Sequence, residues 1–531
     1  MYWLSFTHKA HVDGESLMRL TITSIVFSAA MAGFVLAQSP AEAPKAKEDS
    51  PKDPAVPAQK STESPKEMPP VVKDAKKTGS PAPKAEKSVP VDRFSPTPRP
   101  ERLNLTLLEH PQSRMGVTWR TDSTVTKGMV QVGPANNSGY AMRAHAEKGT
   151  GGFRTIEAKT TPVDAGGEKA HYHKVTLEEL EPGTLYAYRA GDGNNWSEWH
   201  HFRPAKTGSR PFRFVYFGDA QNDVLDYWSR VIRQADRFSP DFMLHAGDLI
   251  DRGENDKEWG QWHAAGGWIH ASVPCLPTPG NHEYSGSANR KSRLTPHWNA
   301  QFNLPANGVK GLEGTCYYID YQNTRFISLN TNEKDRFEEQ AAWLDSVLSA
   351  NHCRWTIVTF HHPVYSSAKN RDNAEVRKFF RPVIEKYKVA LVLQGHDHSY
   401  GRSGMMAGAE EADGSDMAKR GDTVYVVSVS GPKMYQLNDR AWMEVRGEQK
   451  QLFQVIDVSA DAIKYEAYTA TGEKFDAFEI RRDGARNKLV NPGEPIAAPG
   501  GPLMVLWLAA SVVVLVPVGL LGIRFARKVP G

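Results

Sequence analysis

The stretch Phe242-Met-Leu-His-Ala-Gly-Asp248 is an apolar run that ends in a Gly-Asp pair. An earlier run, Phe212–Phe217, ends in the same way, with Gly218-Asp219 directly after it. Two later apolar runs, Thr356–Phe360 and Val389–Leu393, are followed by motifs that contain histidine. Segments of helical period lie between the later runs, so the sequence predicts an α/β domain. In α/β sheets of this kind, ligand-binding and catalytic residues usually lie just after the carboxyl ends of the strands, where these polar motifs occur.

Five short motifs follow these runs in order, and together they offer the side chains of a metal site. They are Gly218-Asp219, Gly247-Asp248, Gly280-Asn281-His282-Glu283, His361-His362 and Gly395-His396-Asp397-His398. Each motif alone is commonly a turn or the capped start of a helix. Carboxylate, amide and imidazole groups at successive strand ends are instead typical of a metal centre. We therefore predict a metal centre at this edge of the domain.

On these motifs, residues 211 to about 440 resemble the calcineurin-like metallophosphoesterase family. With the β domain that precedes them, residues 101–482 are similar in arrangement to purple acid phosphatases. The resemblance implies two facing sheets flanked by helices, and two metal ions bridged by one carboxylate. It implies iron, manganese or zinc, since hard oxygen and imidazole ligands suit these metals. The implied ligands are Asp248 as the bridge, Asp219 and His398 on the first ion, and Asn281, His361 and His396 on the second.

Two positions depart from the family's patterns. Many members have Asp-x-His at the first motif, whereas this chain has Gln221 in place of the histidine. Purple acid phosphatases have a ligating tyrosine three residues after the bridging aspartate, and this chain has Asp251 there. We therefore expect fewer protein ligands on the first ion, with Gln221 or water completing its coordination. We also expect no colour of the tyrosinate–ferric type.

The segment Gly247–Gly253 instead resembles the corresponding motif of serine/threonine protein phosphatases. That resemblance implies that Asp251 orients His282 and that Arg252 binds the substrate phosphate. The implied activity is hydrolysis of a phosphate monoester or diester by a metal-bound hydroxide, with His282 binding the substrate and protonating its leaving oxygen. The alternative is a surface-displayed binding or adhesion protein whose site is weak or inactive.

A different pattern occupies residues 101–207. Leu103–Leu107 and Met115–Trp119 alternate apolar with polar residues, and Gly, Pro and Asn separate such short runs. This period of two predicts an all-β sandwich. The segment His173–Arg189 resembles the end of a fibronectin-III-like domain.

Both ends of the chain carry long uncharged runs. Met18-Arg19 precedes the run Leu20–Ala37, so residues 1–37 have the pattern of a secretory signal peptide that starts at Met18, although an uncleaved anchor is an alternative. Residues 503–523 are uncharged over roughly 30 Å of helix, the thickness of the hydrocarbon core of one membrane. The basic tail 524–531 follows them.

The positive-inside rule predicts that this tail is cytoplasmic. We therefore expect an exported protein that is anchored in the cytoplasmic membrane with its catalytic domain outside. A sorting tail that is later cleaved is the other possibility.

The remaining segments and the composition exclude several classes. Residues 38–100 hold 14 prolines and no Trp or Tyr, too little apolar surface to fold, so we predict a disordered linker there and a second linker at 483–502. The formal net charge of +4 gives no indication of nucleic acid binding. Three cysteines are too few for a disulfide framework.

Overall fold

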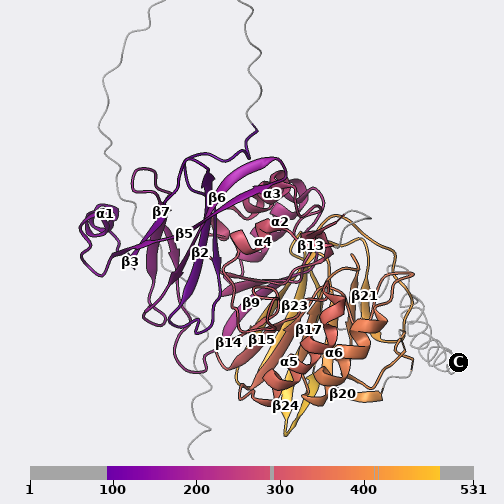
Figure 1. Cartoon of the computed structure of the whole chain (residues 1–531). Helices are drawn as coiled ribbons and strands as arrows, with labels where there is room; N and C mark the ends of the chain where they lie inside the picture. Colours follow the sequence, from indigo (N-terminus) through magenta and orange to yellow (C-terminus); the bar gives the residue numbers. More distant parts are fainter. Residues whose placement is uncertain (1–91, 287–291, 412, 416–417, 491–531) are drawn as a thin grey trace, which may run out of the picture. The chain divides into compact units, whose positions relative to one another are not determined.

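The computed structural model describes residues 92–286, 292–411, 413–415 and 418–490 (Figure 1). The predicted signal peptide, most of the linker 38–100, the transmembrane run 503–523 and the basic tail lie outside these residues. Among the helices of the described part, none has the length and apolar character needed to cross a membrane.

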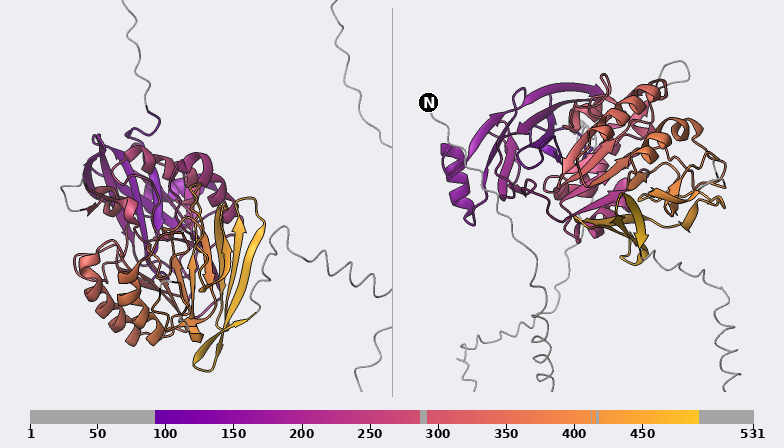
Figure 2. Two further views of the ribbon diagram at one scale, coloured as in Figure 1. Left: turned by 90° about the vertical axis from the view of Figure 1, so that its right-hand side faces the viewer. Right: turned by 90° about the horizontal axis from the view of Figure 1, so that it is seen from below.

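The larger sheet has eleven strands and draws on both halves of the described chain. In spatial order these are β25 (Arg486–Val490), β24 (Lys474–Asp483), β23 (Ala462–Thr469), β22 (Leu452–Val458), β9 (Phe212–Phe217), β10 (Phe242–His245), β11 (Cys275–Pro277), β1 (Glu101–Thr106), β2 (Met115–Asp122), β6 (Glu168–Leu177) and β5 (Lys159–Ala165). Strands β9, β10 and β11 are parallel. The strands β22 to β25 continue the sheet beyond β9 at one edge (Figure 2).

A second sheet of eight strands faces the larger one. Its order is β14 (Tyr317–Tyr321), β15 (Thr324–Ser328), β16 (Trp355–Thr359), β17 (Leu391–Gln394), β20 (Ala418–Val427), β18 (Tyr400–Ser403) and β21 (Met443–Gly447), with β19 (Met406–Ala407) paired to β20. Strands β15, β16 and β17 are parallel. A separate hairpin joins β12 (Tyr284–Ser285) to β13 (Arg293–Leu294).

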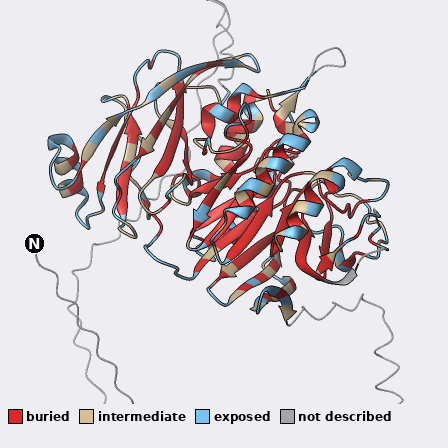
Figure 3. Ribbon diagram, turned by 60° about the horizontal axis from the view of Figure 1, so that its bottom comes forward, coloured by how far each residue is buried: buried red, intermediate tan, exposed pale blue. Residues whose placement is uncertain are grey.

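Helices cover the outer face of each sheet. They are α2 (Val224–Asp236) and α3 (Asp256–Gly266) on the larger sheet and α5 (Phe337–Ser349) and α6 (Ala374–Lys386) on the smaller one (Figure 1). Alternation along the strands explains the layers, because Phe242 and Leu244 of β10 pack between the sheets whereas Met243 packs under α2 and α3. Figure 3 shows these strands buried and the helices exposed on their outer sides. The predicted two-sheet architecture with flanking helices is therefore confirmed.

The N-terminal part is a β domain, as predicted. Its second sheet contains β4 (Arg154–Glu157), β3 (Met129–Pro134), β7 (Tyr186–Gly191) and β8 (His200–Phe202), with the short helix α1 (Gly139–Lys148) beside it (Figure 1). Its first sheet is part of the larger sheet, because β1 pairs in parallel with β11 through Thr106 and Cys275. The smaller elements are α4 (Pro296–Gln301) and the 3-10 turns η1 (Gly267–Ile269), η2 (Asn281–Glu283) and η3 (Lys334–Arg336).

A buried ion cluster also joins the β domain to the rest. Arg102 of β1 and Arg120 of β2 both contact the Oδ2 atom of Asp256 in α3, at 2.8 and 2.6 Å. His297 of α4 lies 3.2 Å from Oδ1 of the same carboxylate. The charge of Asp256 is thus balanced by two arginines of the β domain.

The prediction of a linker at 483–502 is wrong at its start, because β25 lies within it. The strand pairs with β24, and Asn487 donates hydrogen bonds to the carbonyls of Lys388 and Asp422 at 3.0 and 2.7 Å. Its polar sequence has no alternation that would have indicated a strand. The anchoring contacts are with residues 65 and 99 positions earlier in the chain, and such long-range contacts leave no pattern in the sequence.

Three buried histidines pack among tryptophans on the helical side of the larger sheet. The ring of His270 stacks on Trp262 at 4.0 Å between centroids, and His245 lies 5.7 Å from the same indole. Burial lowers the pKa of His245 and His263 well below the usual value and that of His270 to about 4. All three are therefore neutral in the folded protein at neutral pH.

We expect the free energy of unfolding to decrease as the pH falls from 6.5 toward 4. Over this range the unfolded chain binds protons that the folded protein excludes, and for His270 alone the loss reaches roughly 3 kcal/mol at pH 4. His270→Phe keeps a ring against Trp262 and removes the titration. Urea unfolding between pH 4 and 7 should show a smaller decrease for this variant than for the wild type, and identical decreases would contradict the assignment.

Candidate metal centre

The predicted ligands lie at the carboxyl ends of parallel strands in both sheets. Asp219 follows β9, Asp248 follows β10, and Asn281 lies in the turn η2 after β11. His361 follows β16 of the smaller sheet, and His396 and His398 follow β17. Because the two sheets face each other, their strand ends bring these side chains to one place.

Asp219, Asp248 and His398 form one buried group, with one potential ligand atom of each within 4.8 Å of the others. His398 Nε2 lies 3.1 Å from Asp219 Oδ2. The Gln221 amide nitrogen lies 2.9 Å from both Asp248 Oδ2 and His398 Nε2. Gln221 therefore occupies the place that the missing histidine of the first motif would take, and its amide oxygen would become a ligand if the amide turned over.

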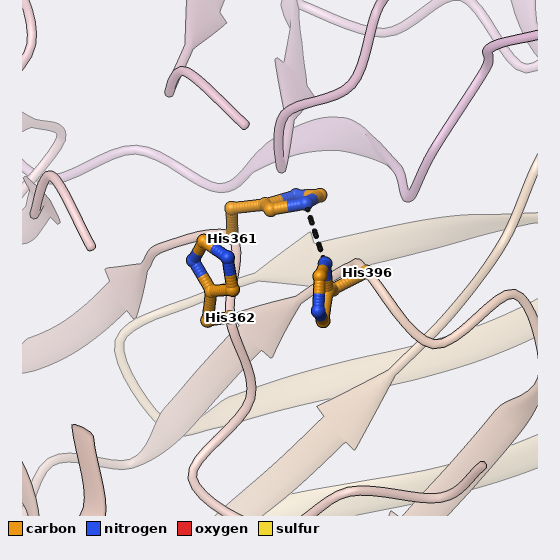
Figure 4. A group of neighbouring side chains, drawn as sticks. All are labelled: His361, His362 and His396. Carbon is orange, nitrogen blue, oxygen red and sulfur yellow. Dashed lines mark hydrogen bonds between the residues drawn. The ribbon is translucent and has the colours of Figure 1, made fainter. Parts of the chain in front are cut away.

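His361, His362 and His396 form the second group (Figure 4). The Nε2 atom of His361 lies 3.1 Å from His396 Nδ1 and also 3.1 Å from the amide oxygen of Asn281. His362, which is not among the implied ligands, bonds to the Thr331 hydroxyl through Nδ1.

Asp248 links the two groups. Asp248 belongs to the first group, and its Oδ2 atom lies 2.9 Å from the Gln221 amide nitrogen and 3.1 Å from His361 Nε2 of the second group. This is the position that a bridging carboxylate requires. The structure thus brings together all six predicted ligands.

Hydrogen bonds to backbone carbonyl groups orient two of the imidazole rings. His361 Nδ1 donates to the carbonyl of Ala246 at 2.9 Å, and His398 Nδ1 donates to the carbonyl of Lys433 at 3.0 Å. With Nδ1 used as a donor, each ring keeps Nε2 available as a metal ligand.

A glycine precedes four of the six ligands and permits the close approach of these loops. A Cβ atom on Gly280 would lie 2.1 Å from Asp248 Oδ1, and one on Gly395 would lie 2.2 Å from Asp219 Oδ1. Asp248 itself, like His396 and His398, has a positive φ, a conformation that costs energy for residues other than glycine. The Gly-Asp, Gly-Asn and Gly-His pairs of the sequence therefore reflect steric need around the site.

The electrostatics of the site call for a bound cation. Burial opposes ionisation of His361, but Asp248 and Asp219 raise its pKa to about 9. Asp219 Oδ2 is buried and accepts no hydrogen bond from the described residues, although His398 Nε2 lies 3.1 Å away. Two buried carboxylates, one of them with an oxygen that accepts no hydrogen bond, and a surrounding set of imidazoles fit metal ions well.

Glu283 is a residue of the third motif whose role the sequence did not indicate. Its carboxylate accepts hydrogen bonds from the backbone N–H groups of Asp248, Leu249 and Gly280, at 2.7 to 2.9 Å. Burial and then the charge of Asp248 raise its pKa to about 7. Glu283 therefore fixes the loop that carries Asp248.

His282 and Asp251 meet as predicted, although mainly through the backbone. His282 Nδ1 lies 2.5 Å from the Asp251 carbonyl oxygen and 3.6 Å from its carboxylate. The Nε2 atom of His282 lies 3.9 Å from Asp248 Oδ2, and the side chain is 25% exposed. His282 is thus at the edge of the ligand cluster and accessible to a substrate.

Arg252 is not brought into this cluster. Its guanidinium pairs with Glu258 of α3 at 2.5 Å, and its side chain is 70% exposed. Arg371, which the sequence did not indicate, is close to the site instead: its Nη1 atom donates to the carbonyl of His396 at 2.9 Å.

Comparisons with known proteins agree with this geometry. The family model described as Calcineurin-like phosphoesterase matches residues 212–400, and that described as Purple acid Phosphatase, N-terminal domain matches residues 100–204. The chain is 30% identical to Acid phosphatase type 7 of Homo sapiens over 339 residues, which cover 58% of this chain and 72% of that protein. The chain belongs to the purple acid phosphatase-like metallophosphoesterase family.

This family assignment confirms the resemblance predicted from the five motifs, and makes the chain a phosphoric ester hydrolase whose family uses a dinuclear metal centre. Purple acid phosphatase 15 of Arabidopsis thaliana is 25% identical over 57% of this chain and 64% of that protein. The β domain matches the purple acid phosphatase type, and no comparison supports the more specific prediction of a fibronectin-III-like domain.

Two solved structures share the fold of this metallophosphoesterase. Purple acid phosphatase PPD1 from yellow lupin superposes with a TM-score of 0.60 at 21% identity, covering 72% of this chain and 75% of that one. The structure of PhoD superposes with a TM-score of 0.54 at 12% identity, covering 75% of this chain and 94% of that one.

Proposed function

We propose that this protein hydrolyses phosphate esters with a dinuclear metal centre. The ions would be held by Asp219, Asp248, Asn281, His361, His396 and His398. The observation that carries the proposal is the position of Asp248, whose one carboxylate oxygen lies beside both ligand groups.

Two ions bound there would lower the pKa of a coordinated water and neutralise the charge of the substrate phosphate. The donor set of carboxylate, amide and imidazole groups suits iron, manganese or zinc. Asp251 at the position of the family's ligating tyrosine removes the phenolate that would select ferric iron.

His282 is proposed as the proton donor to the leaving oxygen. Its Nδ1 proton is held by the Asp251 carbonyl, which can only accept, so Nε2 is the atom free to exchange a proton with the substrate. The Asp251 carboxylate also lies 3.6 Å from Nδ1, so both the carbonyl and the side chain of Asp251 face this side of the ring. Asn222 donates to that carboxylate at 2.8 Å and so holds it in place.

Purified full-length protein should therefore hydrolyse p-nitrophenyl phosphate or its bis-p-nitrophenyl diester. Removal of metal by a chelator should abolish the activity, and iron, manganese or zinc should restore it. The loaded protein should show no tyrosinate–ferric absorption band. A protein that binds two metal ions but hydrolyses neither ester would contradict the proposal and favour the binding or adhesion protein.

We also propose that the protein is exported and held at the cytoplasmic membrane by residues 503–523, with the catalytic domain outside. The support lies in the sequence, where the basic tail 524–531 follows an uncharged run. Mass spectrometry of the membrane fraction tests this: an intact basic tail supports the anchor, and loss of the residues after Pro502 favours a cleaved sorting tail. Full-length protein found wholly in the cytosol would contradict both.

A further inference from the structure

Two loops at the rim of the metal centre are joined to each other. One carries Arg371 and leads into α6, and the other carries Lys433 and Tyr435 after β20. They are joined by an antiparallel bridge between Ala368 and Leu437 and by a backbone hydrogen bond from Lys369 to Gln436. The two loops are therefore held to each other, and a backbone hydrogen bond from Tyr435 to His398 holds the second loop to the turn that carries the ligands.

Asp397, which lies between the two histidine ligands, attaches the first loop to the site. Its buried carboxylate accepts a hydrogen bond from the N–H of Ser367 at 2.7 Å. Its other oxygen lies 3.5 Å from Arg371 Nη1. Asp397 thus positions Arg371 from the same turn that supplies the metal ligands.

Tyr435 supports the guanidinium from the other side. Its ring lies 4.5 Å from the ring of His398, and the Cζ atom of Arg371 lies 4.8 Å from the centre of the Tyr435 ring. Lys433 Nζ lies 5.7 Å from the same ring, which adds a second positive charge at this rim. Distances below about 6 Å are those of cation–π pairs.

Arg371 retains unused donors in this position. Within the described residues, Nη1 is the one nitrogen of its guanidinium for which a hydrogen-bond partner is present. Nε and Nη2 remain available, and the side chain is 32% exposed. A guanidinium with two adjacent free N–H groups matches the geometry of two phosphate oxygens.

We propose that Arg371 binds the terminal phosphoryl group of the substrate and gives the site a preference for phosphomonoesters. This inference rests on the proposed function and specifies its substrate class. A monoester phosphoryl group offers three non-bridging oxygens and carries up to two negative charges, whereas a diester offers two such oxygens and one charge. A cation beside the metal ligands therefore gains more from the monoester.

The test compares Arg371→Gln and Arg371→Lys with the wild type in full-length, metal-loaded protein. Steady-state kinetics are measured on p-nitrophenyl phosphate and on bis-p-nitrophenyl phosphate. Binding of inorganic phosphate is measured separately by calorimetry. Arg143→Gln, on the exposed face of α1, is the control for the loss of one positive charge.

For Arg371→Gln we expect KM for the monoester to rise about tenfold or more and phosphate binding to weaken by a similar factor, as for a lost charge-assisted hydrogen bond. The KM for the diester should change by less than about threefold, since that substrate has fewer oxygens and less charge to offer. Arg371→Lys keeps the positive charge but lacks the two adjacent N–H groups of the guanidinium. Its KM for the monoester and its affinity for phosphate should therefore lie between those of the wild type and of Arg371→Gln.

Metal content is measured for every variant, because Arg371 also bonds to the backbone of His396. Unchanged monoester KM and phosphate binding in Arg371→Gln would overturn the inference, as would equal losses for both esters. If the wild type hydrolyses neither ester, the proposed function fails, but the phosphate isotherms still decide whether Arg371 binds the anion.

Discussion

Asp248→Ala should lower kcat for phosphate-ester hydrolysis by roughly a thousandfold or more, about 4 kcal/mol in the barrier. Asp248 belongs to the first group of potential ligands and lies 3.1 Å from His361 of the second, so its removal affects both ions at once. We expect the variant to retain less than one full equivalent of metal at each site. Metal analysis of the purified protein, together with kcat on p-nitrophenyl phosphate, measures both effects.

The fold should survive this change, since removing a buried negative charge also removes its desolvation cost. Asp248→Asn is a second variant, because it can keep the hydrogen bond that Oδ1 accepts from the His282 N–H. The exposed Asp461 offers a matched control, and Asp461→Ala should leave kcat unchanged. Turnover close to that of the wild type in both Asp248 variants would exclude a shared carboxylate.

His282→Ala should have the next largest effect, and its size should depend on the leaving group. For an alkyl phosphate we expect kcat to decrease about a hundredfold or more, the usual contribution of a positioned proton donor. For p-nitrophenyl phosphate the decrease should be much smaller, because nitrophenolate leaves without a proton. Comparing the two substrates therefore separates proton donation from damage to the metal centre.

The exposed His201 serves as the control for losing a histidine, and His201→Ala should behave as the wild type on both substrates. Asp251→Asn keeps the backbone carbonyl that holds His282 and removes only the charge at 3.6 Å. Its kcat should also decrease more for the alkyl phosphate than for p-nitrophenyl phosphate, but by a smaller factor than in His282→Ala. An equal loss of activity on both esters in His282→Ala would argue against its role as an acid.

The apolar runs that predicted the α/β domain also located the site, because the chemistry follows strand ends. Strands buried on both faces, such as β10, have a continuous apolar pattern that ends abruptly at the ligand. Metal ligands that directly follow a buried strand could therefore be predicted from the sequence. The glycine before Asp219, Asp248 or Asn281 is part of that same signal.

Side chains on irregular loops could not be predicted in this way. Arg252 lies in a motif that implied phosphate binding, yet Glu258 of the following helix takes its guanidinium. Arg371 and Tyr435 come from loops without periodicity, and only the pairing of those loops brings them to His396 and His398. Such contacts depend on tertiary structure and leave no local pattern.

The pairing of β1 with β11 limits how the N-terminal β domain can be exchanged between related proteins. Sequence matching divides the chain between residues 204 and 212, as if two exchangeable modules met there. The structure has no break at that position, because hydrogen bonds between β1 and β11 continue the larger sheet across it. The ion pairs of Asp256 with Arg102 and Arg120 also join the two parts. A β domain transplanted from a relative would have to bring both a matching strand edge and a matching pair of arginines. The two halves are therefore expected to be inherited and exchanged together.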